Sequence, residues 1–380
     1  MGEVNKKSRE ANIELLRIIA MIFVIAIHCI GHGFLLESNE LNIYNQFAIQ
    51  FISCCTTVAN ALFLIITGYY MIDKKFNLKK ILCLWGKTLF YCILIFIVFS
   101  IMGKKTYAYD SFLPIFSGQY WFICAYIALY FFLPIINIVL NKLTKKQFKY
   151  LIITLLIMIG VIRIIFNPSG IFSGAMIPVF MIYAIGAYLR RFVEIKPKKQ
   201  YFIKYILLSI ILFLIYILFE AIYSILDTKY SIFSTNQNLT SILLSIINNL
   251  KEYNSIIVVA MTVFLFMKLK TTTIKSEKIS KLILFISPSV YSIYIIHENI
   301  HLRDFMWTQF GMMNYKDSIM MIPYMIFLIL CVFIVCLAID LIRRYLYIGI
   351  KKVPIIRKFI DKINGILEKF NIKINKYIEE

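Results

Sequence analysis

The stretch IELLRIIAMIFVIAIHCIGHGFL, residues 13–35, decides the fold, because it is an apolar run long enough to cross a bilayer as one helix. A membrane helix needs about 20 mostly apolar residues, and windows of that length identify further runs of the same kind. We therefore predict an all-α integral membrane protein, a bundle of about ten transmembrane helices at 13–35, 47–72, 80–102, 118–140, 149–167, 175–191, 202–226, 253–269, 282–301 and 319–342.

The composition supports a membrane protein. Hydrophobic residues make up 61% of the 380 positions and charged residues 16%, whereas a soluble domain averages about 45–50% and about 25%. The net charge of +21 does not indicate a nucleic-acid partner, because the basic residues flank the apolar runs. Membrane lipids are the expected partner for this charge.

The distribution of basic residues predicts the orientation. With a cytosolic N-terminus, each inner segment holds three or more lysines and arginines and no outer loop holds more than two. This is the asymmetry of the positive-inside rule. Both termini are therefore expected in the cytosol. The protein is expected to cross a bacterial cytoplasmic membrane several times. The oligomeric state is not readable from the sequence.

Two regions follow from this pattern. Residues 1–350 are expected to form the ten-helix transmembrane domain. Residues 351–380 alternate lysine with isoleucine, leucine and phenylalanine, which predicts a basic amphipathic cytosolic tail that lies on the anionic inner leaflet.

The first predicted helix carries two ionisable residues, Arg17 and His28. Such residues are costly inside a bilayer and usually mark function. They are eleven residues apart, so at 100° per residue they lie about 20° from eclipsed and roughly 16 Å apart along the axis. Arg17 can also pair with Glu14, one turn earlier. An interfacial anchor would explain Arg17 alone and a helix–helix hydrogen bond His28 alone, but a shared face favours a joint function.

The chemistry of the two side chains differs. A neutral imidazole can take a proton near neutral pH, so His28 suits general-base catalysis on a hydroxyl. A guanidinium near the cytosolic mouth suits an anionic ligand such as the phosphates of a coenzyme, to which Lys79, Lys80 and Lys87 would add charge. Topology determinants that contact lipid phosphate are the alternative explanation for these lysines.

Five segments, in order, resemble the membrane-bound acyltransferase-3 family. REANIELLRIIAMIFVIAIH at 9–28 contains the R-x10-H pattern, and ALFLIITGYYM at 61–71 resembles F-x-x-S-G-[FY] with Thr67 at the serine. The other three are YWFICAYIALYFFLP at 120–134, FMIYAIGAYL at 180–189 and SPSVYSIYIIHENI at 287–300. The resemblance covers nearly the whole chain, although lysines replace the arginine pair often found after the second helix.

The resemblance implies an O-acyltransferase of surface carbohydrates. It makes His28 the catalytic base and Arg17 its companion in donor binding. Other residues would line or brace the site: Tyr120, Trp121, Tyr291 and His297. Apart from the resemblance, Glu298 lies beside His297 and would orient a helix end or assist acid–base work. We expect transfer of a short acyl group, typically acetyl, from cytosolic acetyl-CoA or another acyl-CoA to a hydroxyl of a cell-surface glycan or its lipid-linked precursor.

Two alternatives stay open. A transporter or flippase of a lipid-linked sugar or exopolysaccharide could use the same bundle, with buried Glu220, Arg163 and Asp340. Two i, i+4 histidine pairs, His28 with His32 and His297 with His301, could also bind a metal. No metal is expected, because no second set of supporting residues is visible in the sequence.

Overall fold

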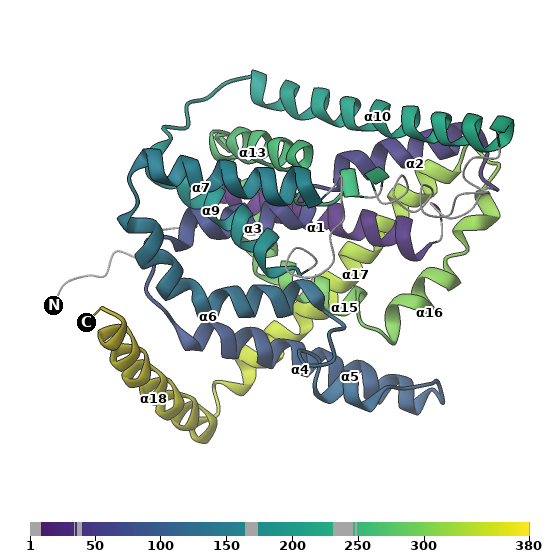
Figure 1. The fold of residues 1–380 in the computed structure, drawn as a ribbon. Helices are drawn as coiled ribbons and strands as arrows, with labels where there is room; N and C mark the ends of the chain where they lie inside the picture. The colour runs from purple at the N-terminus through teal and green to yellow at the C-terminus, as the bar shows by residue number, and fades with distance from the viewer. Residues whose placement is uncertain are drawn as a thin grey trace.

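The computed structural model describes residues 9–33, 35, 40–163, 174–230, 246–247 and 249–379, and within these ranges the regular structure is helical (Figure 1). The helices that bear on the site are α1 (Ala11–His32), α2 (Ile43–Thr56), α3 (Ala59–Met71), α4 (Leu78–Ile101), α6 (Trp121–Lys142), α7 (Lys145–Ile157), α9 (Met176–Phe192), α10 (Gln200–Tyr230), α13 (Ile256–Lys270), α14 (Glu277–Ile286), α15 (Val290–His297), α17 (Met321–Ile350) and α18 (Pro354–Glu379). Two short helices, α5 (Ala108–Phe112) and α16 (Leu302–Gln309), follow α4 and α15.

Most of each predicted apolar range is helical in the described residues, which confirms the all-helical class. The end of the range 149–167 lies outside the described residues from position 164 on. Among the described residues, seven helical stretches are long and apolar enough to cross a membrane, with α2 and α3 joined and α14 and α15 joined. The elements α9 and α13, with 17 and 15 residues, are shorter than a typical crossing. The count of ten crossings therefore stays a prediction.

The predicted helix at 282–301 differs from the structure at both its middle and its end. A short 3₁₀ turn at Ser287–Ser289 contains Pro288, which cannot donate a backbone hydrogen bond, and it separates α14 from α15. Helix α15 then ends at His297, and residues 298–301 form turns that lead into α16. These turns place the residues after His297 beside α1.

Helix α1 is central to the bundle. It contacts α2, α3, α13, α14, α15 and α17. Its positions Leu16, Ala20, Ile25 and Cys29 are completely buried. A helix with neighbours on most sides is apolar over most of its surface, so its few polar side chains must find partners or face a cavity.

Two glycines allow α3 and α9 to pack closely. A Cβ at Gly68 would overlap the carbonyl oxygen of Tyr183, and a Cβ at Gly186 would overlap that of Ile65. Small residues at such crossings are typical of membrane helix pairs, because they let two backbones approach. This close contact fixes the α3 wall of the cavity described below.

Candidate active site

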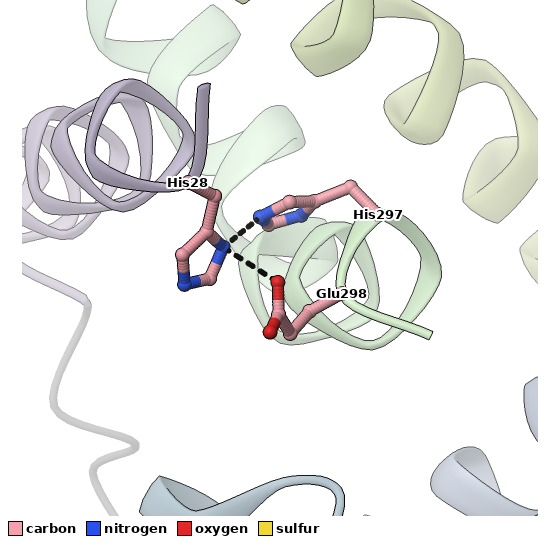
Figure 2. Close-up of side chains that lie close together, drawn as sticks. All are labelled: His28, His297 and Glu298. Carbon is pink, nitrogen blue, oxygen red and sulfur yellow. Dashed lines mark hydrogen bonds and ion pairs between the residues drawn. The ribbon is translucent and has the colours of Figure 1, made fainter. Parts of the chain in front are cut away.

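His28 lies at the centre of a polar cluster between α1 and the end of α15 (Figure 2). Its Nδ1 is 2.9 Å from Oε2 of Glu298 and 3.0 Å from Nε2 of His297. His297 is completely buried, and the side chain of His28 is 19% exposed. Sequence positions 28 and 297 are thus brought into direct contact.

The hydrogen-bond partners assign the tautomers of both imidazoles. Nδ1 of His297 is 2.6 Å from the carbonyl oxygen of Ile293, which can only accept, so this Nδ1 carries the proton and Nε2 is an acceptor. Nδ1 of His28 faces that acceptor and a carboxylate oxygen, so it must be the donor to both. Neutral His28 therefore has its lone pair on Nε2, which points away from His297 and Glu298 in Figure 2.

Glu298 is surrounded by donors. Besides His28, Nε2 of His32 is 3.3 Å from its Oε2, and Nη1 of Arg303 is 3.2 Å from its Oε1. Hydrogen bonds and a neighbouring positive charge favour the ionised form of a carboxyl group. An ionised Glu298 would hold the His28 ring in place and stabilise it once it takes a second proton.

A cavity of about 410 Å³ lies along α1, on the side of the cluster that faces the start of this helix. One end is lined by Arg9, Glu14 and Arg17, and the other by Val24 and Tyr294. Val24 is one turn before His28, and the ring centroid of Tyr294 is 6.2 Å from that of His28. The volume is in the range of small-molecule sites, so a ligand in it would extend from the arginines to the His28 cluster.

Arg17 and Glu14 form the opposite pole of the cavity. Glu14 is buried, and its carboxylate is bonded to the Arg17 guanidinium, whose side chain is 33% exposed. A guanidinium has five donor N–H groups, so this single carboxylate leaves capacity for an anionic ligand. Arg9, which is exposed at the rim, adds a second guanidinium.

Comparison with known protein families identifies the family of the chain. Residues 10–341 match the model of the acyltransferase-3 family, described as an acyltransferase domain. The chain belongs to the acyltransferase-3 family. Comparisons with curated proteins and with solved structures give no match. Family membership and the apolar helices together support a multi-pass membrane acyltransferase.

The tyrosines that the family resemblance singles out take different positions. Tyr291 lines the cavity, and its hydroxyl is 2.7 Å from that of Thr88. Tyr120 is buried behind the cluster, where it donates to the Ile295 carbonyl oxygen at 2.9 Å and so braces α15. Trp121 is 43% exposed and packs against Tyr253, away from the described lining of the cavity.

The departure at Thr67 keeps the hydroxyl that serine would supply. Thr67 lines the cavity, and its hydroxyl donates to the Phe63 carbonyl oxygen at 2.8 Å. The expected lysine contacts are less direct. Lys79 and Lys80 are exposed, Lys87 is half-buried, and the described lining of the cavity contains none of the three. Their role as donor contacts stays a prediction, and Arg9 is the basic residue that the sequence did not single out.

The residues that would serve a transporter lie elsewhere. Asp340 is completely buried, where it accepts hydrogen bonds from Tyr91 at 2.6 Å and from Arg343 at 2.8 Å. Glu220 and Arg163 are partly buried, and neither belongs to the described lining of the cavity. This cavity therefore does not bring the three ionisable groups together.

A metal site with four imidazoles is not formed by the described side chains. His301 accepts a hydrogen bond from the Tyr107 backbone N–H at Nε2, 2.8 Å away, and its Nδ1 is 3.1 Å from Oδ1 of Asn299. The ligand atoms of His28, His297 and Glu298 do lie within 4.8 Å of one another, a spacing at which they can hold a cation. The same three groups form the hydrogen-bonded base described above.

Proposed function

We propose that this protein transfers a short acyl group, typically acetyl, from a cytosolic acyl-CoA to a hydroxyl of a cell-surface glycan or its lipid-linked precursor. The observation that carries the proposal is the hydrogen bonding of His28, which leaves Nε2 as its basic atom. This base lies beside one end of a cavity whose other end presents Arg9 and Arg17.

The chemical step needs a base and a path for one proton. The acceptor hydroxyl gives its proton to Nε2 of His28 while its oxygen attacks the thioester carbonyl carbon. Glu298 stabilises the resulting imidazolium through Nδ1, as a carboxylate does in hydrolytic triads. The C–S bond then breaks, the coenzyme thiolate takes the proton from Nε2, and the products are an ester and free coenzyme A.

The two ends of the cavity suit the two substrates. Guanidinium groups bind phosphate through paired hydrogen bonds, so Arg9 and Arg17 suit the phosphates of an acyl-CoA. The predicted orientation places these arginines on the cytosolic side, in a bacterial cytoplasmic membrane. His28, near the opposite end of α1, would then meet an acceptor that approaches from the outer side.

The test is incorporation of radiolabelled acetyl from acetyl-CoA into cell-envelope glycan by membranes that contain the wild-type protein or His28→Ala. We expect incorporation by the wild type and its loss in His28→Ala, with coenzyme binding retained, because Arg9 and Arg17 are untouched. Lys281→Gln is the matched control, since Lys281 is an exposed α14 residue that pairs with Glu277.

Two outcomes would contradict the proposal. Equal incorporation by wild type and His28→Ala would exclude His28 as the base. No incorporation with acetyl-, succinyl- and longer acyl-CoA donors, together with export of a glycan that survives His28→Ala, would exclude acyl transfer from coenzyme A and favour transport.

A further inference from the structure

Helix α18 presents three different faces. Phe359, Ile363 and Phe370 form an apolar stripe at spacings of four and seven residues, and their side chains are 64%, 40% and 45% exposed. The exposed lysines Lys362, Lys369 and Lys373 form a second stripe beside it. The third face carries Asn371 and Asn375, four residues apart and therefore neighbours on the helix surface.

The asparagine face holds a turn of the bundle. Asn375 accepts from the Phe76 backbone N–H at 3.0 Å and donates to the Phe76 carbonyl oxygen at 3.0 Å. Asn371 accepts from the Leu78 N–H at 2.9 Å and donates to Oδ1 of Asn77 at 3.3 Å. These four bonds attach α18 to residues 72–80, the lysine turn, which connects α3 to the first residues of α4 and carries Lys74, Lys75, Lys79 and Lys80.

Helix α6 holds the same turn from the other side. Asn137 donates to the Met71 carbonyl oxygen at 2.8 Å, and Asn141 donates to that of Ile72 at 3.2 Å. The Tyr130 hydroxyl donates to the Asn77 carbonyl oxygen at 3.3 Å. The α6 contacts come from a helix of the bundle itself. The α18 contacts come from a helix that follows α17 and lies at the edge of the bundle (Figure 1).

We propose that α18 binds the surface of an anionic lipid leaflet and from there positions the lysine turn through Asn371 and Asn375. The exposed apolar stripe fits the boundary between headgroups and acyl chains, and the adjoining lysines fit anionic headgroups. Both asparagines face the protein, so lipid binding and attachment to the turn use separate faces and take place together.

The lysine turn connects this surface to the cavity rim. Met71 separates the turn from Tyr70. The Tyr70 hydroxyl accepts from Lys270 at 3.1 Å, and Lys270 also pairs with Glu10 beside Arg9. A role in admitting the acyl donor rests on the proposed function. The lipid-dependent order of the turn does not, and it can be measured without any acyl transfer.

The experiment is backbone hydrogen exchange on the full chain in nanodiscs of phosphatidylcholine, with or without phosphatidylglycerol. For the wild type we expect slower exchange in α18 and at the Phe76 and Leu78 amides when phosphatidylglycerol is present. Asn371→Ala with Asn375→Ala should speed exchange at these two amides about threefold to tenfold, because each loses its hydrogen-bond acceptor. Exchange within α18 should keep its lipid dependence.

Two further variants complete the test. Asn364→Ala should behave as wild type, because no hydrogen bond is found for the Asn364 side chain in the described part of the chain. A Lys362→Gln, Lys369→Gln, Lys373→Gln variant should lose the difference between the two nanodiscs in both α18 and the turn.

Identical wild-type exchange in both nanodiscs would overturn the proposed binding of α18 to anionic lipid. Unchanged exchange at the Phe76 and Leu78 amides in the asparagine variant would overturn the proposed positioning of the lysine turn by Asn371 and Asn375. Absence of acyl transfer would bear on the proposed function alone.

Discussion

The two ends of the α1 face differ in how firmly their ionisable side chains are held. His28 has partners on another helix, and its partner Glu298 is itself bound by His32 and Arg303. In the described part of the chain, the ion-pair partner of Arg17 is Glu14, on its own helix. A side chain held by several neighbours suits a reaction that needs a fixed geometry. A side chain with unused hydrogen-bond donors suits the binding of a charged ligand. The comparison separates a reacting end from a binding end.

The largest expected effect comes from removing the base and keeping its hydrogen bonds. The Gln side chain in His28→Gln can still donate to Glu298 but cannot take a proton, so kcat should fall roughly 10²- to 10⁴-fold while KM for the acyl donor stays nearly constant. The measurement is steady-state acyl transfer in detergent or nanodiscs. A rise in KM with an unchanged kcat would mean that His28 belongs to the binding end instead.

A smaller loss is expected for Glu298→Gln. The amide keeps the shape of the side chain but removes the charge that stabilises the His28 imidazolium, so kcat should fall by roughly 10²-fold, less than for His28→Gln. Arg303→Gln, which removes one donor to the same carboxylate, should cost less again. Additive losses in a His28→Gln, Glu298→Gln double variant would contradict the joint action of the two residues, because residues that act as a unit are non-additive.

Arg17→Gln should sharpen the comparison from the other end. Loss of a charged hydrogen-bond donor typically costs about 1.5–3 kcal/mol, so KM for the acyl donor should rise at least about tenfold with little change in kcat. Binding of coenzyme A by isothermal calorimetry provides a direct check, with Lys281→Gln as the surface control. An equal loss of kcat in Arg17→Gln and His28→Gln would remove the distinction between the two ends.

The sequence predicted these two ends because they depend on local periodicity. Arg17 and His28 share a face in any regular α-helix, and Arg17 indeed lines the cavity while His28 lies one turn beyond Val24. His297 was named through the family resemblance and Glu298 through its position beside His297, and the structure brings both to His28. The role of each residue in catalysis stays a prediction.

Other parts of the site depend on turns and tertiary packing. The sequence predicted one helix through residue 301. The observed helix ends at His297, and the turns that follow bring Arg303 back to Glu298. Arg9 lies outside the apolar run and was therefore not distinguished from other basic residues near the membrane. Hydropathy likewise predicts apolar helices but not how far α9 and α13 extend across the bilayer.

The smallest expected effect concerns the pair formed by Glu10 and Lys270 at the binding end. Burial alone would raise the pKa of the Glu10 carboxyl, but the hydrogen bond and charge of Lys270 hold it below its ordinary value of 4.5. A carboxyl whose pKa is lower in the folded state stabilises the fold above its unfolded pKa, and this contribution is lost as the pH falls through the folded value.

Because the Glu10 side chain is 43% exposed, solvent screening limits the contribution to about 0.5 kcal/mol. Glu10→Gln should therefore lower the melting temperature by only about 1 °C near pH 7, and the difference from wild type should shrink as the pH falls below 4.5 and be lost once the pH is below the folded-state pKa. A difference that persists or grows in acid would mean that the variant acts through packing rather than through the ion pair. A large loss at pH 7 would show that the binding end is held as firmly as the His28 cluster.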